Sequence, residues 1–198
     1  MNTHKTSYYV INGITMYRLV SAPFLLLLAY IGEVVWFKWL LALSFLTDAI
    51  DGPLSRKFNV TSVFGSRLDS VADDATVLVS TIAIWLIHPE FINSKWMVIV
   101  ALLALFGIQT VAALVAYQRV TSFHTYLAKT AAVVQAIFFI MIFFHLGPVQ
   151  LMFYIAALIT AVQLLEEIIL VILLPEWKAN VKGLYWVLRF QKHTLHSD

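Results

Sequence analysis

Six long apolar runs constrain this chain more than any other feature of its sequence. They have roughly 17 to 24 residues each, at positions 14–30, 34–50, 66–87, 96–117, 126–146 and 151–174. A helical run of about 20 apolar residues matches the hydrocarbon thickness of a bilayer. Helices are the expected elements, because in lipid each helix satisfies its own backbone hydrogen bonds. The pattern predicts an all-α integral membrane bundle of six transmembrane helices.

Composition favours a membrane protein over a soluble domain. Of the 198 residues, 61% are hydrophobic and 12% are charged, and the mean hydropathy is +0.86. A soluble domain of this size could not bury so much apolar side chain. The sequence has no cysteine, which excludes disulfides and thiolate chemistry. We expect a single domain with an interfacial N-terminal segment, a six-helix bundle and an interfacial tail, at residues 1–13, 14–174 and 175–198.

The positions of lysine and arginine predict the orientation in the membrane. With the N-terminus in the cytoplasm, eleven basic residues lie at the inner ends of the runs and two, Lys38 and Lys95, at the outer ends. Basic residues concentrate on the cytoplasmic side of membrane proteins. We therefore expect both termini in the cytoplasm, and the inner or plasma membrane of a prokaryote as the location. The eleven are Lys5, Arg18, Arg56, Lys57, Arg67, Arg119, Lys129, Lys178, Lys182, Arg189 and Lys192.

Two pairs of aspartates lie where the second run ends and the third begins. Asp48 and Asp51 are three positions apart, and Asp69 and Asp73 are four apart. On a helix, each spacing puts both carboxylates on one face. If the two helices pack side by side, the four acidic groups converge and repel one another unless cations neutralise them. Divalent cations are the simplest remedy, and two-metal sites suit phosphoryl transfer.

Residues 48–73 resemble the motif of the CDP-alcohol phosphotransferase family of membrane enzymes. The family pattern is D-x2-D-G-x2-A-R-x8-G-x3-D-x3-D, and the sequence matches seven of its eight specified positions. The one departure is Ser55, where the family usually has alanine, and serine is small enough to keep a close approach. A match of this length is far more specific than a lone glycine motif. The matching residues are Asp48, Asp51, Gly52, Arg56, Gly65, Asp69 and Asp73.

The resemblance implies a role for each part of the motif. Two Mg²⁺ or Mn²⁺ ions would be held by the four aspartates, Asp48, Asp51, Asp69 and Asp73. Asp73 would also be the general base that takes a proton from an acceptor hydroxyl. The hydroxyl oxygen would attack the β-phosphorus of a CDP-linked lipid, and CMP would leave. The residues implied to hold that lipid are Asn12, Thr15, Gly52, Ser55, Arg56, Ser62 and Gly65.

Residue chemistry supports several of these roles. Gly52 has no side chain, so a bulky nucleotide can approach the backbone there, and Arg56 offers a planar charged fork that suits a phosphate. Gly65 permits a tight entry into the third helix, with Ser62 or Ser66 as its N-cap. The N-terminus of that helix adds partial positive charge near bound phosphates.

Basic residues after the fourth run predict an acceptor site. The resemblance implies that basic residues in this region, here Arg119 and Lys129, hold an anionic acceptor. For Lys129, ordinary flanking of a membrane span is the alternative. Glu166 and Glu167 lie within the sixth run, where a carboxylate faces a cavity or a basic partner, or is a protonated or paired structural group. We include Glu166 in the acceptor site.

The C-terminal tail has the pattern of an amphipathic helix. On a helical wheel Lys178, Lys182, Arg189 and Lys192 fall within an arc of about 80°, beside an apolar arc. This predicts an interfacial helix on anionic headgroups. A frayed tail is the alternative, because Gly183 weakens a helix.

The resemblance implies a transferase that makes phospholipid from CDP-diacylglycerol and a small alcohol, and this is the leading hypothesis. The basic residues favour a phosphorylated acceptor, with glycerol 3-phosphate as the first choice. Serine, an inositol phosphate and phosphatidylglycerol are alternatives. An ion-coupled transporter and a noncatalytic scaffold are competing classes, but the chain has no internal repeat typical of transporters and keeps all four aspartates. We expect membrane lipids and a second copy of the chain as partners, and no nucleic acid.

Overall fold

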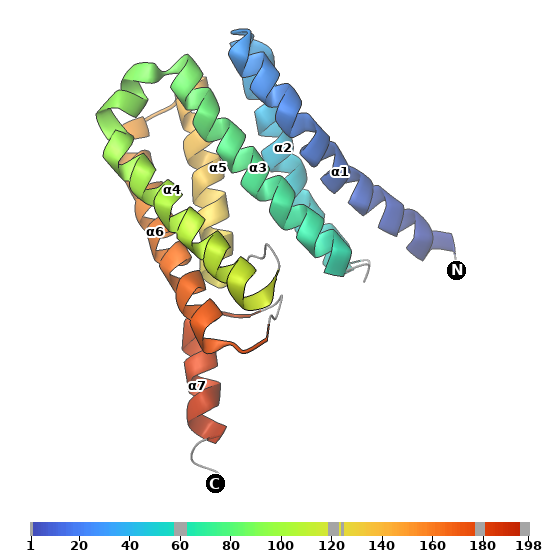
Figure 1. Cartoon of the computed structure of the whole chain (residues 1–198). Helices are drawn as coiled ribbons and strands as arrows, with labels where there is room; N and C mark the ends of the chain where they lie inside the picture. Colours follow the sequence, from blue (N-terminus) through green and yellow to red (C-terminus); the bar gives the residue numbers. More distant parts are fainter. Residues whose placement is uncertain (1, 58–62, 119–122, 124, 177–180, 195–198) are drawn as a thin grey trace. The chain divides into compact units, whose positions relative to one another are not determined.

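The computed structural model describes residues 2–57, 63–118, 123, 125–176 and 181–194, and every regular element among them is an α-helix (Figure 1). The all-α prediction is confirmed for this part of the chain. In chain order the helices are α1 (Asn2–Tyr30), α2 (Val34–Lys57), α3 (Val63–Ile87), α4 (Pro89–Tyr117), α5 (Tyr126–Phe144), α6 (Val149–Leu173) and α7 (Leu184–Thr194).

Glycine or proline lies at several of the breaks between helices. Gly32 lies in the turn between α1 and α2 with φ of +80°, a conformation that glycine adopts without the clash a Cβ would cause. His88 alone separates α3 from α4. Pro89 begins α4, at a position where the missing backbone N–H breaks no helical hydrogen bond.

Some predicted boundaries were wrong. α3 begins at Val63, so Ser66 lies inside the helix and is not its N-cap, while Ser62 lies outside the described residues. α7 begins only at Leu184, because Gly183 has a non-helical backbone with φ of +144°. Lys182 therefore precedes the helix, and the predicted basic arc does not lie on one continuous helix. Lys178, part of the same arc, lies outside the described residues.

Three of the described helices, α4, α5 and α6, are long and apolar enough to cross a membrane. In α1 the apolar stretch Met16–Tyr30 is shorter. Large apolar side chains are nevertheless exposed on all of the helices, for example Phe24, Leu43 and Ile172. Exposed apolar surface on this scale indicates a lipid environment. The chain is a membrane protein, and the number of six spans stays a prediction.

The chain divides into two compact units, of which the first comprises Met1–Lys95 and Phe139–Leu146. In this unit α1 packs extensively against both α2 and α3, while α2 and α3 contact each other at few points (Figure 1). Small buried side chains at these contacts, such as Ala22, Ser44 and Ala72, let the helix backbones approach closely. The two helices that carry the acidic pairs therefore both pack on α1, rather than extensively on each other.

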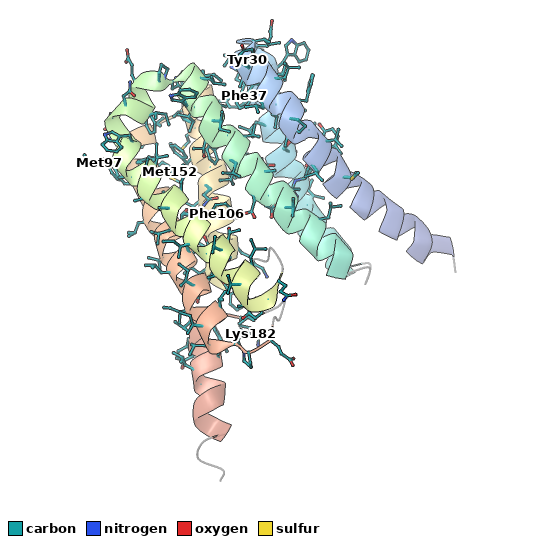
Figure 2. All side chains as sticks on the ribbon, in the orientation of Figure 1. Tyr30, Phe37, Met97, Phe106, Met152 and Lys182 are labelled. Atoms are coloured by element: carbon teal, nitrogen blue, oxygen red, sulfur yellow. The ribbon has the colours of Figure 1, made fainter. Side chains whose placement is uncertain are left out.

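Aromatic packing closes the end of this unit that contains the turn between α1 and α2. Phe37 is fully buried, and its ring centroid lies 4.7 Å from that of Phe143 in an edge-to-face arrangement. Tyr30, near the same turn, is exposed (Figure 2). The end of α5 thus completes the core of the first unit.

The second unit comprises Trp96–Phe138 and Gly147–Asp198. A hydrophobic cluster holds it together, and side chains of α7 pack against that cluster. The Tyr117 hydroxyl, at the end of α4, donates a hydrogen bond of 2.9 Å to the carbonyl of Leu174. The buried members of the cluster are Ala113, Phe123, Leu170, Val171 and Val181, with Leu184 and Val187 of α7 against them.

Candidate functional site

Both acidic pairs of the motif lie on helices, as the spacing predicted. Asp48 and Asp51 lie in the last turns of α2, and Asp69 and Asp73 lie in the first turns of α3. The structure describes the side chains of Asp48 and Asp73 only, so the directions of the other two carboxylates stay a prediction.

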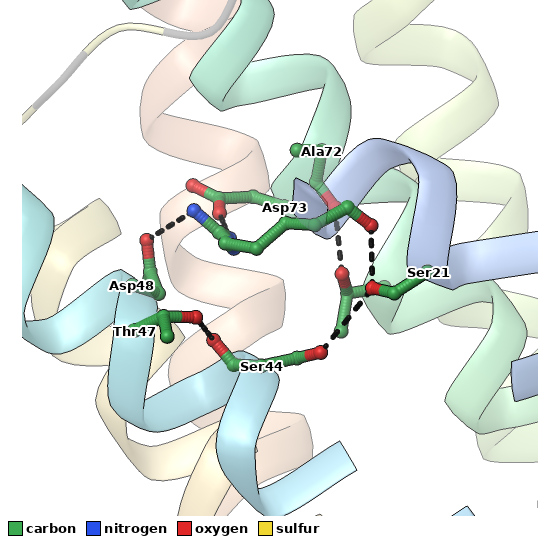
Figure 3. A network of polar contacts seen from close by, with 8 residues as sticks. Ser21, Ser44, Thr47, Asp48, Ala72 and Asp73 are labelled. Carbon is green, nitrogen blue, oxygen red and sulfur yellow. Dashed lines mark hydrogen bonds and ion pairs between the residues drawn. The ribbon is translucent and has the colours of Figure 1, made fainter. Parts of the chain in front are cut away.

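Arg18 of α1 joins the two acidic helices. Its Nη1 lies 2.8 Å from Asp48 Oδ1, and its Nη2 forms an ion pair with Asp73 Oδ1 (Figure 3). The Arg18 side chain is 2% exposed, whereas the side chains of Asp48 and Asp73 are 33% and 37% exposed. The cation is therefore enclosed within the unit, while both carboxylates keep an open side.

Hydroxyl side chains and small residues support this cluster. The Ser21 hydroxyl donates to the carbonyl of Arg18 at 2.8 Å and lies 3.5 Å from the hydroxyl of Ser44 on α2 (Figure 3). On α3 the Thr76 hydroxyl donates to the carbonyl of Ala72 at 2.7 Å. These buried hydroxyls thus have partners, as the low-polarity interior requires. The close helix packing they permit places Arg18 between its two carboxylates.

One guanidinium does not neutralise this cluster. Arg18 carries one positive charge against the two carboxylates of Asp48 and Asp73, and Asp51 and Asp69 lie about one turn away on the same helices. Carboxylate oxygens are the ligands that Mg²⁺ and Mn²⁺ prefer. The excess negative charge and the partly exposed oxygens therefore fit a divalent cation. Among the described side chains no three potential ligands gather, so the structure describes two of the four predicted ligands, Asp48 and Asp73, and their role as ligands stays a prediction.

The residues predicted to hold the CDP-lipid flank the cluster along the chain. Asn12 and Thr15 precede Arg18 on α1, Gly52 follows Asp48 on α2, and Gly65 lies in the first turn of α3. The structure does not describe the side chains of Asn12, Thr15, Ser55 and Arg56, and Ser62 lies outside the described residues. Their role as a lipid-binding set stays a prediction.

The predicted acceptor residues that the structure describes, Lys129 and Glu166, belong to the second unit. Lys129 lies on α5 with its side chain exposed, and its Nζ is 5.8 Å from the centroid of the Tyr126 ring. Arg119 lies outside the described residues. In Glu166 of α6, Oε1 accepts a hydrogen bond of 3.0 Å from the backbone N–H of Leu184, the first residue of α7. Glu166 thus satisfies a free N–H at a helix start, which is a structural role.

Glu167 differs from its neighbour in both burial and partners. It is 1% exposed, and its carboxylate accepts hydrogen bonds from the side-chain amides of Gln109 at 2.8 Å and Gln163 at 2.7 Å. These contacts favour the alternative of a satisfied structural carboxylate over an open acceptor site.

Sequence reasoning missed Arg18 as part of the site. The signal was present, because a charged residue near the start of an apolar run faces a partner or a cavity. From the sequence, Arg18 was interpreted only as one of the basic residues that indicate orientation. Its partners lie 30 and 55 positions away, and no local pattern connects them.

A family model described as CDP-alcohol phosphatidyltransferase matches residues 8–165, which is most of the chain. The matched range includes Arg18 and all four aspartates of the motif. Comparison with solved structures found no match.

Curated relatives match over a shorter range. A protein of Wigglesworthia glossinidia brevipalpis named CDP-diacylglycerol–glycerol-3-phosphate 3-phosphatidyltransferase is 34% identical over 93 residues, covering 46% of this chain and 49% of the relative. The protein of the same name from Escherichia coli strain K12 is 33% identical over 92 residues, covering 44% and 48%. The chain spans about half the length of the curated relatives it matches.

Proposed function

Because the chain belongs to the CDP-alcohol phosphatidyltransferase family, we propose that it transfers a phosphatidyl group from CDP-diacylglycerol to a small alcohol and releases CMP. One observation carries the proposal: α2 and α3 each contribute a carboxylate, Asp48 and Asp73, to one cluster around Arg18. The partly exposed oxygens of that cluster can bind a ligand, whereas a noncatalytic scaffold would not require exposed, incompletely neutralised acids.

Divalent metal ions are generally used by this family. We propose Mg²⁺ or Mn²⁺ as the cofactor, two ions in all, with Asp48, Asp51, Asp69 and Asp73 as the ligands. Bound there, such ions offset negative charge on a pyrophosphate and on its leaving group. The carboxylates of Asp48 and Asp73 supply hard oxygens for them on two helices.

Asp73 is the proposed general base. Its carboxylate is 37% exposed, so an acceptor hydroxyl can reach it, and a carboxylate within hydrogen-bond reach can take the hydroxyl proton. The hydroxyl oxygen then attacks the β-phosphorus of CDP-diacylglycerol, the bond to CMP breaks, and the phosphatidyl group passes to the acceptor. We propose that Asn12, Thr15, Gly52, Ser55, Arg56, Ser62 and Gly65 hold the CDP-lipid.

Glycerol 3-phosphate is the proposed acceptor. The names of the curated relatives support this choice, and so do the basic residues Arg119 and Lys129, which suit an anionic acceptor. Glu166 has the weakest support as an acceptor residue, because its carboxylate already accepts a hydrogen bond from the backbone N–H of Leu184. We further propose that the chain is a homodimer and that its active site and both termini are cytoplasmic, as the distribution of basic residues favours.

An acceptor panel tests the proposal. The detergent-solubilised full chain is incubated with CDP-diacylglycerol, Mg²⁺ and one acceptor at a time: glycerol 3-phosphate, serine, an inositol phosphate or phosphatidylglycerol. We expect CMP release and a phosphorylated lipid product with glycerol 3-phosphate alone. Activity with a different acceptor would correct the substrate, and no CMP release with any acceptor in Mg²⁺ or Mn²⁺ would contradict the reaction.

A further inference from the structure

We propose that Arg18 is a built-in counter-ion of the acidic cluster and competes with divalent cations for Asp48 and Asp73. The inference rests on the proposed function only in expecting a divalent cation at these carboxylates. It assigns Arg18 a positioning role: without metal, its guanidinium holds together two carboxylates that would help to hold a metal ion.

The geometry of the guanidinium carries the first step. The two terminal nitrogens of Arg18 contact carboxylates on different helices, Asp48 on α2 and Asp73 on α3. Since α2 and α3 contact each other at few points, the cation from α1 links the two acidic helices. The planar guanidinium presents its N–H donors in a fixed fork, which suits contact with two carboxylates at once.

Burial carries the second step. Arg18 is 2% exposed, while each of its two aspartate partners keeps about a third of its side-chain surface in the open. An enclosed guanidinium is stable only when anions surround it, because removing a charge from water is costly. Ions from outside can reach the exposed parts of the same two carboxylates. The cluster thus has a fixed internal cation and an accessible external face.

Competition between the two cations follows from this arrangement. A divalent ion on the carboxylates either displaces the guanidinium or lies beside it, and like charges at that distance repel. Each cation therefore lowers the affinity of the other by the same factor. A neighbouring opposite charge changes the proton affinity of a carboxylate by about ten- to a thousandfold. We expect the neutral substitution Arg18→Gln to tighten metal binding by at least about tenfold.

Direct metal binding tests the inference without any substrate. Mn²⁺ is titrated into the detergent-solubilised full chain, and the free ion is measured by electron paramagnetic resonance. The apparent Kd of Arg18→Gln should be at least about tenfold below that of the wild type. In EDTA the melting temperature of the variant should fall below that of the wild type, and Mn²⁺ should raise it more than it raises that of the wild type.

Lys38→Gln is the matched control, because it removes a positive charge from α2 away from the carboxylates. Lys38 Nζ lies 5.1 Å from the centroid of the Phe144 ring, and its substitution should leave the Mn²⁺ affinity unchanged. Equal or weaker Mn²⁺ binding by folded Arg18→Gln would overturn the inference. If that variant does not fold, Arg18→Met repeats the test, and failure of both to fold even in Mn²⁺ would overturn it, because the metal should replace the lost charge. Wild-type protein that binds Mn²⁺ but releases no CMP would contradict the proposed function alone.

Discussion

Each unit of the molecule buries an ionisable side chain, and the two units satisfy its polar atoms in different ways. In the first unit the enclosed Arg18 contacts Asp48 and Asp73, whose carboxylates are about one-third exposed. In the second unit the enclosed Glu167 accepts hydrogen bonds from the neutral amides of Gln109 and Gln163. One cluster is charged and open, and the other is closed and satisfied by neutral donors.

The difference shows how a candidate functional site can be distinguished from a cluster with a structural role. Both clusters place carboxylates on apolar helices, so an intramembrane acid by itself does not identify a site. The distinguishing features are the excess charge and the exposure of the partners. The cluster around Arg18 retains negative charge that a further cation can neutralise, whereas the Glu167 cluster has its hydrogen-bonding groups engaged within the unit. Four experiments test this distinction, from the largest expected effect to the smallest.

Metal removal should have the largest effect on the open cluster. Chelation with EDTA should abolish CMP release, because the carboxylates of the site need divalent charge to bind a pyrophosphate, and added Mg²⁺ or Mn²⁺ should restore it. Activity is measured as CMP released before chelation, after it and after metal is added back. Full activity in metal-free buffer would contradict the two-metal proposal. The cluster around Arg18 would then need no further cation, like the cluster around Glu167.

Asp73→Asn should lower turnover by at least about a hundredfold, the usual contribution of a general base. Binding of CDP-diacylglycerol and metal should remain measurable, because the other carboxylates stay in place. Asp48→Asn and Asp69→Asn should lower turnover and also weaken metal binding. The measurement is the rate of CMP release at saturating substrates, alongside Mn²⁺ affinity.

The adjacent aspartate offers a matched control for that variant. Asp74 undergoes the same chemical change on the same helix, but it lies about 100° around the helix axis from Asp73. We expect Asp74→Asn to keep turnover within a few-fold of the wild type. Near-normal turnover of Asp73→Asn would place the base elsewhere.

Lys129→Gln tests whether the second unit also contributes to substrate binding. Loss of a charge that contacts a phosphorylated acceptor costs about 1.5–3 kcal/mol, or roughly a factor of ten to a hundred. The effect should raise the acceptor KM and leave the affinity for CDP-diacylglycerol unchanged. Kinetics with both substrates varied decide the question. Lys95→Gln, on the predicted outer side, is the control, and an unchanged acceptor KM in Lys129→Gln would remove this residue from the site.

Glu167→Gln should have the smallest effect on activity and act on stability instead. The substitution replaces one carboxylate oxygen, a hydrogen-bond acceptor, by an NH₂ group, which would face the N–H donor of Gln109 or Gln163. That hydrogen bond would be lost, and a buried polar group without a partner costs about 1–3 kcal/mol of stability. We expect a lower melting temperature with turnover near that of the wild type. Glu176→Gln makes the same change at an exposed position and should leave both the melting temperature and the turnover unaltered. A loss of turnover at full stability would show that the second cluster belongs to the site.

The sequence by itself determined the helices and the family. Runs of apolar residues and their glycine and proline breaks are local features, and they predicted the central parts of α1 to α6 because helical backbone bonds form within each segment. The aspartate spacing of three and four positions was likewise decisive, because helix geometry alone puts such pairs on one face. Local patterns were weakest at helix ends, as the late start of α7 at Leu184 shows.

Only the tertiary structure decided which charged groups meet. Arg18 and Asp73 lie 55 positions apart, and their contact depends on the small buried residues that let α1 approach α3. Glu166 and Glu167 are neighbours in sequence but have different hydrogen-bond partners. Glu166 accepts from the backbone at the start of α7, and Glu167 accepts from the side chains of Gln109 and Gln163. Consecutive residues point about 100° apart on a helix, so the packing around α6 assigns each carboxylate its partner.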